Sequence, residues 1–292
     1  MRTNDDDNRF RLMAVHAHPD DESSKGAAAM AKYAADGAQV LVVTCTGGEQ
    51  GDVLNPEMAP GQHDMGSLRR AELARACELL GVRHQLLGFA DSGLAEQADG
   101  CFARQPLDVV TAPLVRVMRE FRPHVVLAYD RTGGYPHPDH VMCHRAAVEA
   151  FDAAGDPDLF PEHGPAWLAS KLYFHVGLHP ARLAALLDAA VERPPSWAGE
   201  VETLLAHDPW PTLPVTTRVP CGEHFATKER ALRAHQSQID PRGFWFVFPA
   251  DVQRAAWPTE DFHLARTRVH TELPENDLFA GIAETAPLRL VG

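Results

Sequence analysis

The chain has 292 residues, of which 45% are hydrophobic, and its formal net charge is −13. This size fits two average domains or one large α/β domain, and the apolar fraction is that of a protein with a packed core. The acidic balance argues against nucleic-acid and anionic-membrane partners, which need clustered Lys and Arg, and no run of 18 apolar residues predicts a membrane span.

Cysteine usage and the N-terminus indicate a cytoplasmic protein. The five cysteines are odd in number and form no Cys-x-x-Cys pair, so we expect neither a disulfide framework nor a zinc ribbon. Free thiols are typical of a reducing compartment. Residues 1–8 are polar and acidic, unlike a secretory signal.

The first half of the chain alternates between strand and helix patterns. The apolar run 10–15 predicts a buried strand, and a helix is expected from Ser23 to Tyr33, ending by Gly37. The continuous, β-branched run 39–44 is typical of a parallel strand covered on both faces. The next elements are predicted as helix 67–80, strand 85–89, helix 108–121, strand 125–129 and a helix from Pro138 to Phe151.

This alternation predicts a Rossmann-like α/β fold, an open, mostly parallel sheet with helices on both faces. In the 3-2-1-4 strand order of doubly wound folds, the first and fourth strands are neighbours where the winding reverses, and ligands bind in the crevice there. Beyond this half, we expect strands at 171–175 and 214–219 and helices at 181–191 and 223–238.

The second half is an elaboration of the first. The proline-containing segment 194–214 suggests an irregular cap over the site. We therefore expect a single domain, 1–292, in which residues 9–160 form the Rossmann-like half with the metal site. Residues 161–292 would complete the substrate pocket.

Two clusters of His and Asp follow predicted strands. Residues 16–22 read His-Ala-His-Pro-Asp-Asp-Glu directly after the first strand, and residues 133–140 read Gly-Gly-Tyr-Pro-His-Pro-Asp-His directly after the fourth. One His-Pro-Asp-Asp alone is often a turn with a helix cap. Two such clusters, each at the end of a buried strand, favour a shared site in the crevice.

The residue types in these clusters suit a hydrolytic metal site. Zinc in hydrolases is held by three protein ligands that leave a position for water, and His18, Asp21 and His140 would supply them. Asp20, beside the ligands but free of the metal, is the expected general base. We expect Asp139 to orient His137 or keep it protonated, and expect His137 and Tyr135 to support the oxyanion of a tetrahedral intermediate.

These motifs resemble the zinc-dependent N-acetylglucosaminyl deacetylase superfamily, the LmbE and PIG-L-like proteins. The resemblance extends from Leu12 to about Leu278 and includes Glu22-Ser23-Ser24-Lys25-Gly26, Thr46-Gly47-Gly48-Glu49, Asp91-Ser92-Gly93-Leu94, Ala234-His235 and Gln238-Ile239-Asp240-Pro241. It implies the same metal ligands and the same base. It also implies that the substrate is bound by Lys25, Glu49, Arg69 and Asp91.

Within the superfamily the chain is most similar to the mycothiol S-conjugate amidases. That likeness implies cleavage of the amide between N-acetylcysteine and glucosaminyl-inositol in a small-molecule thiol conjugate, with release of a mercapturic acid. The alternatives are the N-acetyl-glucosaminyl-inositol deacetylase of mycothiol biosynthesis, and a paralogue that processes a mycothiol-tagged antibiotic intermediate. Zn²⁺ is the expected cofactor, Fe²⁺ suits the same ligands, and a homo-oligomer is compatible with the sequence.

Two readings from other classes are less favoured. Non-haem iron oxygenases also use two His and one carboxylate, but usually as His-x-Asp on a β-sandwich, whereas His18 and Asp21 are spaced His-x-x-Asp beside a predicted parallel sheet. A nucleotide-binding module would carry Gly-x-Gly-x-x-Gly after the first strand, and the sequence has none there.

Overall fold

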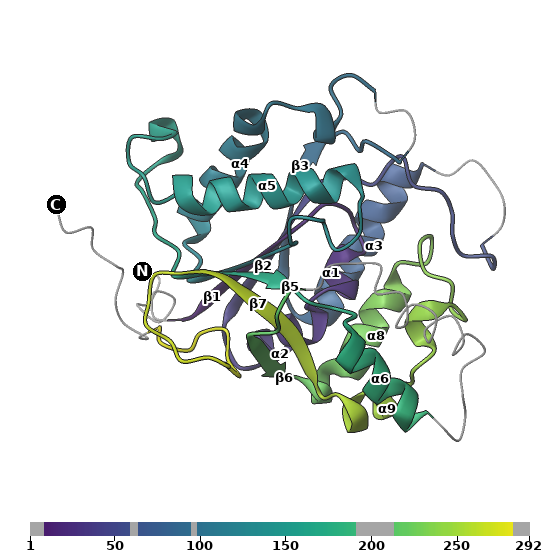
Figure 1. Ribbon diagram of the computed structural model, residues 1–292. Helices are drawn as coiled ribbons and strands as arrows, with labels where there is room; N and C mark the ends of the chain where they lie inside the picture. Colours follow the sequence, from purple (N-terminus) through teal and green to yellow (C-terminus); the bar gives the residue numbers. More distant parts are fainter. Residues whose placement is uncertain (1–8, 59–63, 95–97, 191–212, 283–292) are drawn as a thin grey trace, which may run out of the picture.

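The computed structural model describes residues 9–58, 64–94, 98–190 and 213–282 (Figure 1). A seven-stranded sheet with the order β3-β2-β1-β4-β5-β7-β6 forms its centre. β1 to β5 are parallel, and β7 is antiparallel to both of its neighbours. The strands are β1 (Arg11–His16), β2 (Gln39–Thr46), β3 (Arg83–Phe89), β4 (Val125–Ala128), β5 (Lys171–His175), β6 (Thr217–Pro220) and β7 (Thr259–Thr267).

Helices cover both faces of this sheet (Figure 1). On β1, Met13 and Val15 pack into a core with α4 and α5, whereas Leu12 and Ala14 pack into a second core with α2 and α3. Side chains of a strand alternate between faces, so both faces of β1 are buried. The helices are α1 (Asp21–Ser24), α2 (Ala27–Ala35), α3 (Met65–Leu80), α4 (Leu107–Phe121), α5 (Pro138–Ala153), α6 (Pro180–Ala189), α8 (Phe225–Ala234) and α9 (Ala250–Ala256).

The expected fold class and the 3-2-1-4 strand order are confirmed. β1 pairs with both β2 and β4, so the chain leaves β1 and β4 at adjacent points of the same sheet edge. Both His/Asp clusters begin there. None of the helices in the described ranges is long and apolar enough to cross a membrane.

Three expectations differ from the structure. The helix expected from Ser23 is split into α1 and α2 at Gly26, whose φ is +75° and where a Cβ would lie 2.8 Å from His175 Cε1. The helix expected to reach Gln238 ends at Ala234. β7 and α9 were not expected, and β7 joins β6 to β5 in the sheet. Most of the expected cap, at 194–214, lies outside the described residues.

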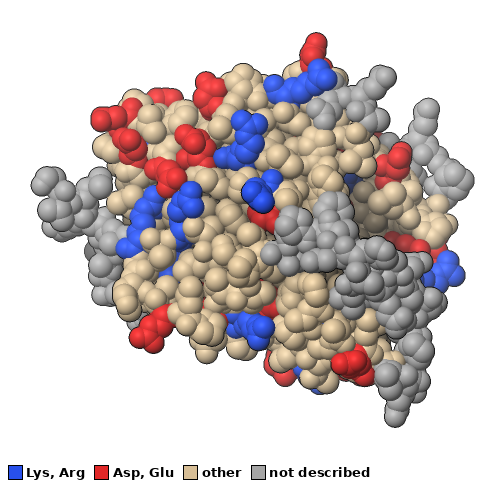
Figure 2. Space-filling model, viewed as in Figure 1, with Lys and Arg blue, Asp and Glu red and all other residues tan. Residues whose placement is uncertain are grey.

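Acidic and basic side chains are interspersed among neutral ones on the face of the molecule in Figure 2.

A buried ionic cluster ties the C-terminal segment to the sheet. Glu275 is 6% exposed, and its carboxylate contacts Lys171 Nζ, which is fully buried. The same carboxylate accepts hydrogen bonds from Tyr173 Oη at 2.6 Å and Thr217 Oγ1 at 2.9 Å. Burial alone would raise the pKa of Glu275, but these donors and Lys171 outweigh it and lower the pKa. The cluster therefore stabilises the folded state only while Glu275 is ionised.

Glu275→Gln should lower the free energy of unfolding at pH 7 by about 3 kcal/mol, because Lys171 would remain buried without its counter-charge. A folded-state pKa below the unfolded value of about 4.3 gives stability that is present above that pH and lost in acid. The difference from wild type should therefore shrink as the pH falls below about 4. Urea unfolding at pH 7 and below about pH 4 measures this difference in stability. The variant Glu272→Gln, at an exposed glutamate, is the matched control. Equal stability of the two variants at pH 7 would contradict the expectation.

Candidate active site

The three expected metal ligands meet in the structure. His140 Nε2 lies 3.3 Å from Asp21 Oδ2 and 3.3 Å from His18 Nδ1, and His18 Nδ1 lies 3.6 Å from Asp21 Oδ2. All three residues are buried. Bonds of about 2.0–2.2 Å to a tetrahedral zinc ion place ligand atoms about 3.3–3.6 Å apart. The donor types and their spacing therefore fit a zinc ion.

Local backbone and ring contacts aim these side chains at one another. Asp21 begins α1, and its Oδ2 accepts the His18 N–H at 3.0 Å. His140 lies in the first turn of α5, where its ring stacks on Tyr129 with centroids 4.5 Å apart and its Nδ1 faces the Gly133 carbonyl at 2.9 Å. A Cβ at Gly133 would lie 2.5 Å from His140 Cβ. The glycine therefore lets the loop approach the ring closely.

The other ring nitrogen of His18 faces two carboxylates. His18 Nε2 lies 3.1 Å from Asp139 Oδ2 and 3.5 Å from Asp91 Oδ1. Burial alone would lower the pKa of His18, but its contacts with Asp139, Asp21 and Asp91 outweigh it and raise the pKa well above 6.5. A carboxylate behind the imidazole is the usual way to orient a metal-binding His.

The Asp139 carboxylate therefore contacts His18, whereas the sequence had suggested that it would pair with His137. His137 is the N-cap of α5, and its Nδ1 accepts the Asp139 N–H at 3.1 Å. Burial, together with the nearby His18 and His140 rings, lowers the pKa of His137 to about 4. The His137 ring is neutral near pH 7 instead of protonated.

Two other residue groups in the described ranges could also hold a metal ion, and both include His18. They are His18 with His137 and His140, and His18 with Asp91 and Asp139. We favour the triangle with Asp21, because His18 Nε2 already faces Asp139 and the atoms of the triangle have tetrahedral spacing.

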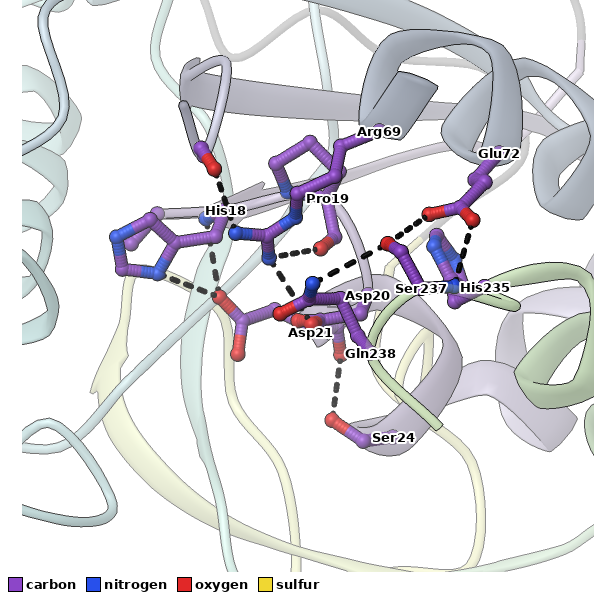
Figure 3. Close-up of polar contacts among 12 residues, drawn as sticks. His18, Pro19, Asp20, Asp21, Ser24, Arg69, Glu72, His235, Ser237 and Gln238 are labelled. Atoms are coloured by element: carbon purple, nitrogen blue, oxygen red, sulfur yellow. Dashed lines mark hydrogen bonds and ion pairs between the residues drawn. The ribbon is translucent and has the colours of Figure 1, made fainter. Parts of the chain in front are cut away.

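Asp20 has an unusual backbone and a buried cation beside its side chain. Its φ is 114°, and its Oδ2 lies 3.0 Å from Arg69 Nη2 (Figure 3). Burial raises the pKa of Asp20, and Arg69 opposes this effect. Arg69 also donates to the carbonyls of Pro19 at 2.7 Å and Gly48 at 2.8 Å. Gly48 has a φ of +67°, and a Cβ there would lie 2.4 Å from Arg69 Nη1, so the loop favours glycine at this position.

The residues expected to bind substrate lie around this centre, but two of them contact protein carboxylates. Arg69 is 4% exposed and pairs with Asp20, as described. Lys25 Nζ lies 2.7 Å from Asp21 Oδ1, on the side of that carboxylate away from the ligand triangle. Glu49 Oε1 accepts the Asp91 N–H at 2.8 Å. Tyr135 is 44% exposed, and its ring lies edge-on to His140 with centroids 4.6 Å apart.

A small cavity of about 80 Å³ opens beside α1, where Ser24 lines it. The other lining residues come mainly from α6, α8 and the 244–248 turn, and they are both apolar, as Leu183 and Phe225 are, and charged, as Lys228 and Glu229 are. The cavity is therefore lined by residues of both halves of the chain, and the N-terminal half also carries the ligand triangle.

Sequence reasoning gave no role to Glu22, although Glu22 lies in the first His/Asp cluster, and none to His235. Glu22 and His235 are both fully buried, and His235 Nε2 lies 2.7 Å from Glu22 Oε1. A partnership between residues 213 positions apart cannot be read from local patterns. The one available signal was the Ala234-His235 stretch, which belongs to the resemblance with the deacetylase superfamily.

Comparison with known proteins agrees with this geometry. The PIG-L family model, described as GlcNAc-PI de-N-acetylase, matches residues 13–151. A mycothiol S-conjugate amidase of Streptomyces coelicolor is 46% identical, over 95% of this chain and 99% of that protein. A 1D-myo-inositol 2-acetamido-2-deoxy-alpha-D-glucopyranoside deacetylase of Frankia casuarinae is 41% identical, over 94% and 95%.

Among solved structures, the fold is similar to that of the N,N'-diacetylchitobiose deacetylase of Pyrococcus horikoshii. The TM-score is 0.61 at 18% identity, with 87% of this chain and 83% of that chain covered. With relatives above 40% identity along nearly the whole chain and a family model over the half that carries both His/Asp clusters, the chain belongs to the PIG-L/LmbE family.

Proposed function

We propose that the protein is a zinc-dependent amidase that cleaves the amide between N-acetylcysteine and glucosaminyl-inositol in mycothiol S-conjugates. The observation that carries the proposal is the buried triangle of His18, Asp21 and His140 with Asp20 beside it. The likeness to the S. coelicolor amidase supports the choice of substrate. When bound, zinc would polarise the amide carbonyl and make a water molecule acidic enough to lose its proton near neutral pH.

Asp20 is assigned to proton transfer. Its Oδ2 is paired with Arg69, so we assign Oδ1 to accept the proton of the attacking water. The same oxygen then returns the proton to the leaving nitrogen as the C–N bond breaks. Burial raises the pKa of Asp20, which makes it a better base than an exposed aspartate.

His137 and Tyr135 are assigned to the oxyanion. His137 Nδ1 accepts a backbone N–H, so in the neutral ring Nε2 carries the hydrogen and can donate it. A donor held in this way before the reaction is suited to the negative charge that develops on the carbonyl oxygen. Asp139 and Asp91 act through His18, because their carboxylates hold its Nε2.

The cavity beside α1 supports a conjugate as the substrate. Its apolar lining residues, among them Leu183, Phe225 and Trp245, suit an apolar group on the sulfur of a thiol conjugate, and charged residues such as Lys228 and Glu229 line the same cavity. An N-acetyl sugar has only a methyl group to place there. The sister activity, deacetylation of N-acetyl-glucosaminyl-inositol, is the alternative, since a deacetylase with that named substrate is 41% identical.

Loss of one ligand should remove the metal. His140→Ala should lower zinc affinity by more than about 100-fold, because the loss of an outer partner alone already costs about 10–100-fold. Zinc content after dialysis against a fixed chelator concentration is the measurement. His144→Ala, one turn further along α5 and bonded to the Tyr129 carbonyl, is the matched control. A wild-type zinc content in His140→Ala would place the metal elsewhere.

Asp20→Asn should separate catalysis from metal binding. The variant should keep its zinc, and kcat should fall about 10²–10⁴-fold, which is the usual contribution of a positioned general base. Asp21→Asn should instead lose zinc first and recover part of its activity in excess zinc. The Asp20 side chain makes no capping hydrogen bond at the start of α1. If Asp20→Asn turns over at the wild-type rate, Asp20 serves only as the partner of Arg69.

The substrate assignment is tested by comparing kcat/KM for a mycothiol S-conjugate with kcat/KM for N-acetyl-glucosaminyl-inositol. We expect the conjugate to be favoured at least about tenfold, a difference of roughly 1.4 kcal/mol in transition-state binding. Faster hydrolysis of the acetyl sugar would reassign the protein to the biosynthetic deacetylases. Slow turnover of both substrates with zinc bound would favour a tagged antibiotic intermediate.

A further inference from the structure

Asp20 is held in a backbone conformation that it would not adopt alone. Its φ of 114° and ψ of −27° lie outside the regions that non-glycine residues prefer. Such residues persist only where surrounding contacts hold them, and they cluster at active sites. The conformation fixes the direction of the Asp20 side chain, so whatever holds the backbone also positions the carboxylate.

Glu22 provides one such contact. Its Oε2 accepts the Asp20 N–H at 3.0 Å, and its Oε1 accepts the Ser23 hydroxyl. The carboxylate is fully buried, and its negative charge would be costly to bury without a further strong donor. His235 Nε2 is that donor, 2.7 Å from Oε1.

His235 comes from the C-terminal half of the chain. Its backbone is restrained by a pair of hydrogen bonds from Ser237 to Glu72, which we call the clasp. His235 follows the last residue of α8. Two residues later, Ser237 donates from its N–H at 2.8 Å and its hydroxyl at 2.7 Å to the buried Glu72 of α3 (Figure 3). The clasp restrains the backbone on which His235 stands, so the imidazole is held rigidly against Glu22.

We propose that Glu22 and His235 are positioning residues for catalysis, with His235 holding Glu22 and Glu22 holding the backbone N–H of Asp20. Arg69 fixes the Asp20 side chain from the other direction. The inference rests on the proposed role of Asp20 as general base. It adds that a residue of the C-terminal half, distant in sequence from both His/Asp clusters, sets the geometry of proton transfer.

Removal of the His235 ring should therefore lower kcat and leave metal binding intact. We expect His235→Ala to reduce kcat about 10²-fold, the effect of a misplacement of about 1 Å, with zinc content and KM near wild type. His179→Ala is the matched control, because His179 is another buried His that faces a carboxylate, Asp261, at 2.7 Å. It should lose comparable stability and keep its kcat.

A double-mutant cycle with Asp20→Asn distinguishes positioning from a merely structural role. If His235 acts through Asp20, His235→Ala should lower kcat less than about threefold in the Asp20→Asn background. An equal loss in both backgrounds, loss of zinc, or an unchanged kcat in His235→Ala would overturn the inference. If Asp20→Asn alone keeps full turnover, both the general-base assignment and the positioning role of His235 fail. A large loss in Asp20→Asn with additive effects of His235→Ala refutes only the positioning role.

A conservative pair of variants covers the case in which His235→Ala does not fold. The amide nitrogen of Gln extends to about the position of a His Nε2, whereas that of Asn is shorter and matches Nδ1. His235→Gln should therefore keep most of the wild-type kcat, and His235→Asn should lose it. Equal kcat values for the two variants would contradict the requirement for a donor at Glu22.

Discussion

The pairing of β1 with β4 is the constraint on which the site depends. These parallel strands are adjacent in the sheet although more than 100 residues separate them in the sequence. The chain turns away from both at the same edge, so residues 16–22 and 129–140 must share the space beyond it. His18 and Asp21 arrive from one strand and His140 from the other.

The electrostatic cost of this arrangement explains many of the neighbouring contacts. Apart from the exposed Glu49, five buried or partly buried carboxylates, those of Asp20, Asp21, Glu22, Asp91 and Asp139, lie in or around the centre, against the two cations Lys25 and Arg69. The formal surplus is three negative charges, which are expensive to bury without partners. The raised pKa values of His18 and His235 show that the site attracts positive charge. A bound divalent cation would supply it in place of the proton on His18.

The sequence predicted the framework well because the framework follows from local patterns. The continuous apolar run at β2 and the run from Val125, both buried on two faces, identified parallel strands, and Gly81 marked the end of α3. The strand order and the family were confirmed. β7 was missed because the acidic pair Glu260 and Asp261 interrupts the apolar pattern near its start. Both residues are buried in the structure, where Glu260 pairs with Lys228 and Asp261 with His179, and these distant partners cannot be read from the local sequence.

The same reasoning explains what the sequence could not predict within the site. Spacing indicated that His18, Asp21 and His140 could share a metal ion, and the structure brings them together, while their catalytic roles remain predictions. It did not indicate that the carboxylate of Asp139 faces His18 and not His137. That choice depends on His137 acting as the N-cap of α5. Nor could it show that Arg69 forms an ion pair with Asp20 and that Lys25 forms one with Asp21.

The clasp at the end of α8 has a consequence for the modularity of this fold. Glu22 and Glu72 belong to the Rossmann-like half, yet their buried carboxylates find donors in His235 and Ser237. A chain cut before α8 would remove the His235 donor from Glu22 and both Ser237 donors from Glu72, and would leave two acids in the first half with fewer partners. The segment that the family model spans is therefore not a transplantable module. Chimeras that exchange C-terminal halves between relatives must carry both donors with them to retain a folded first half.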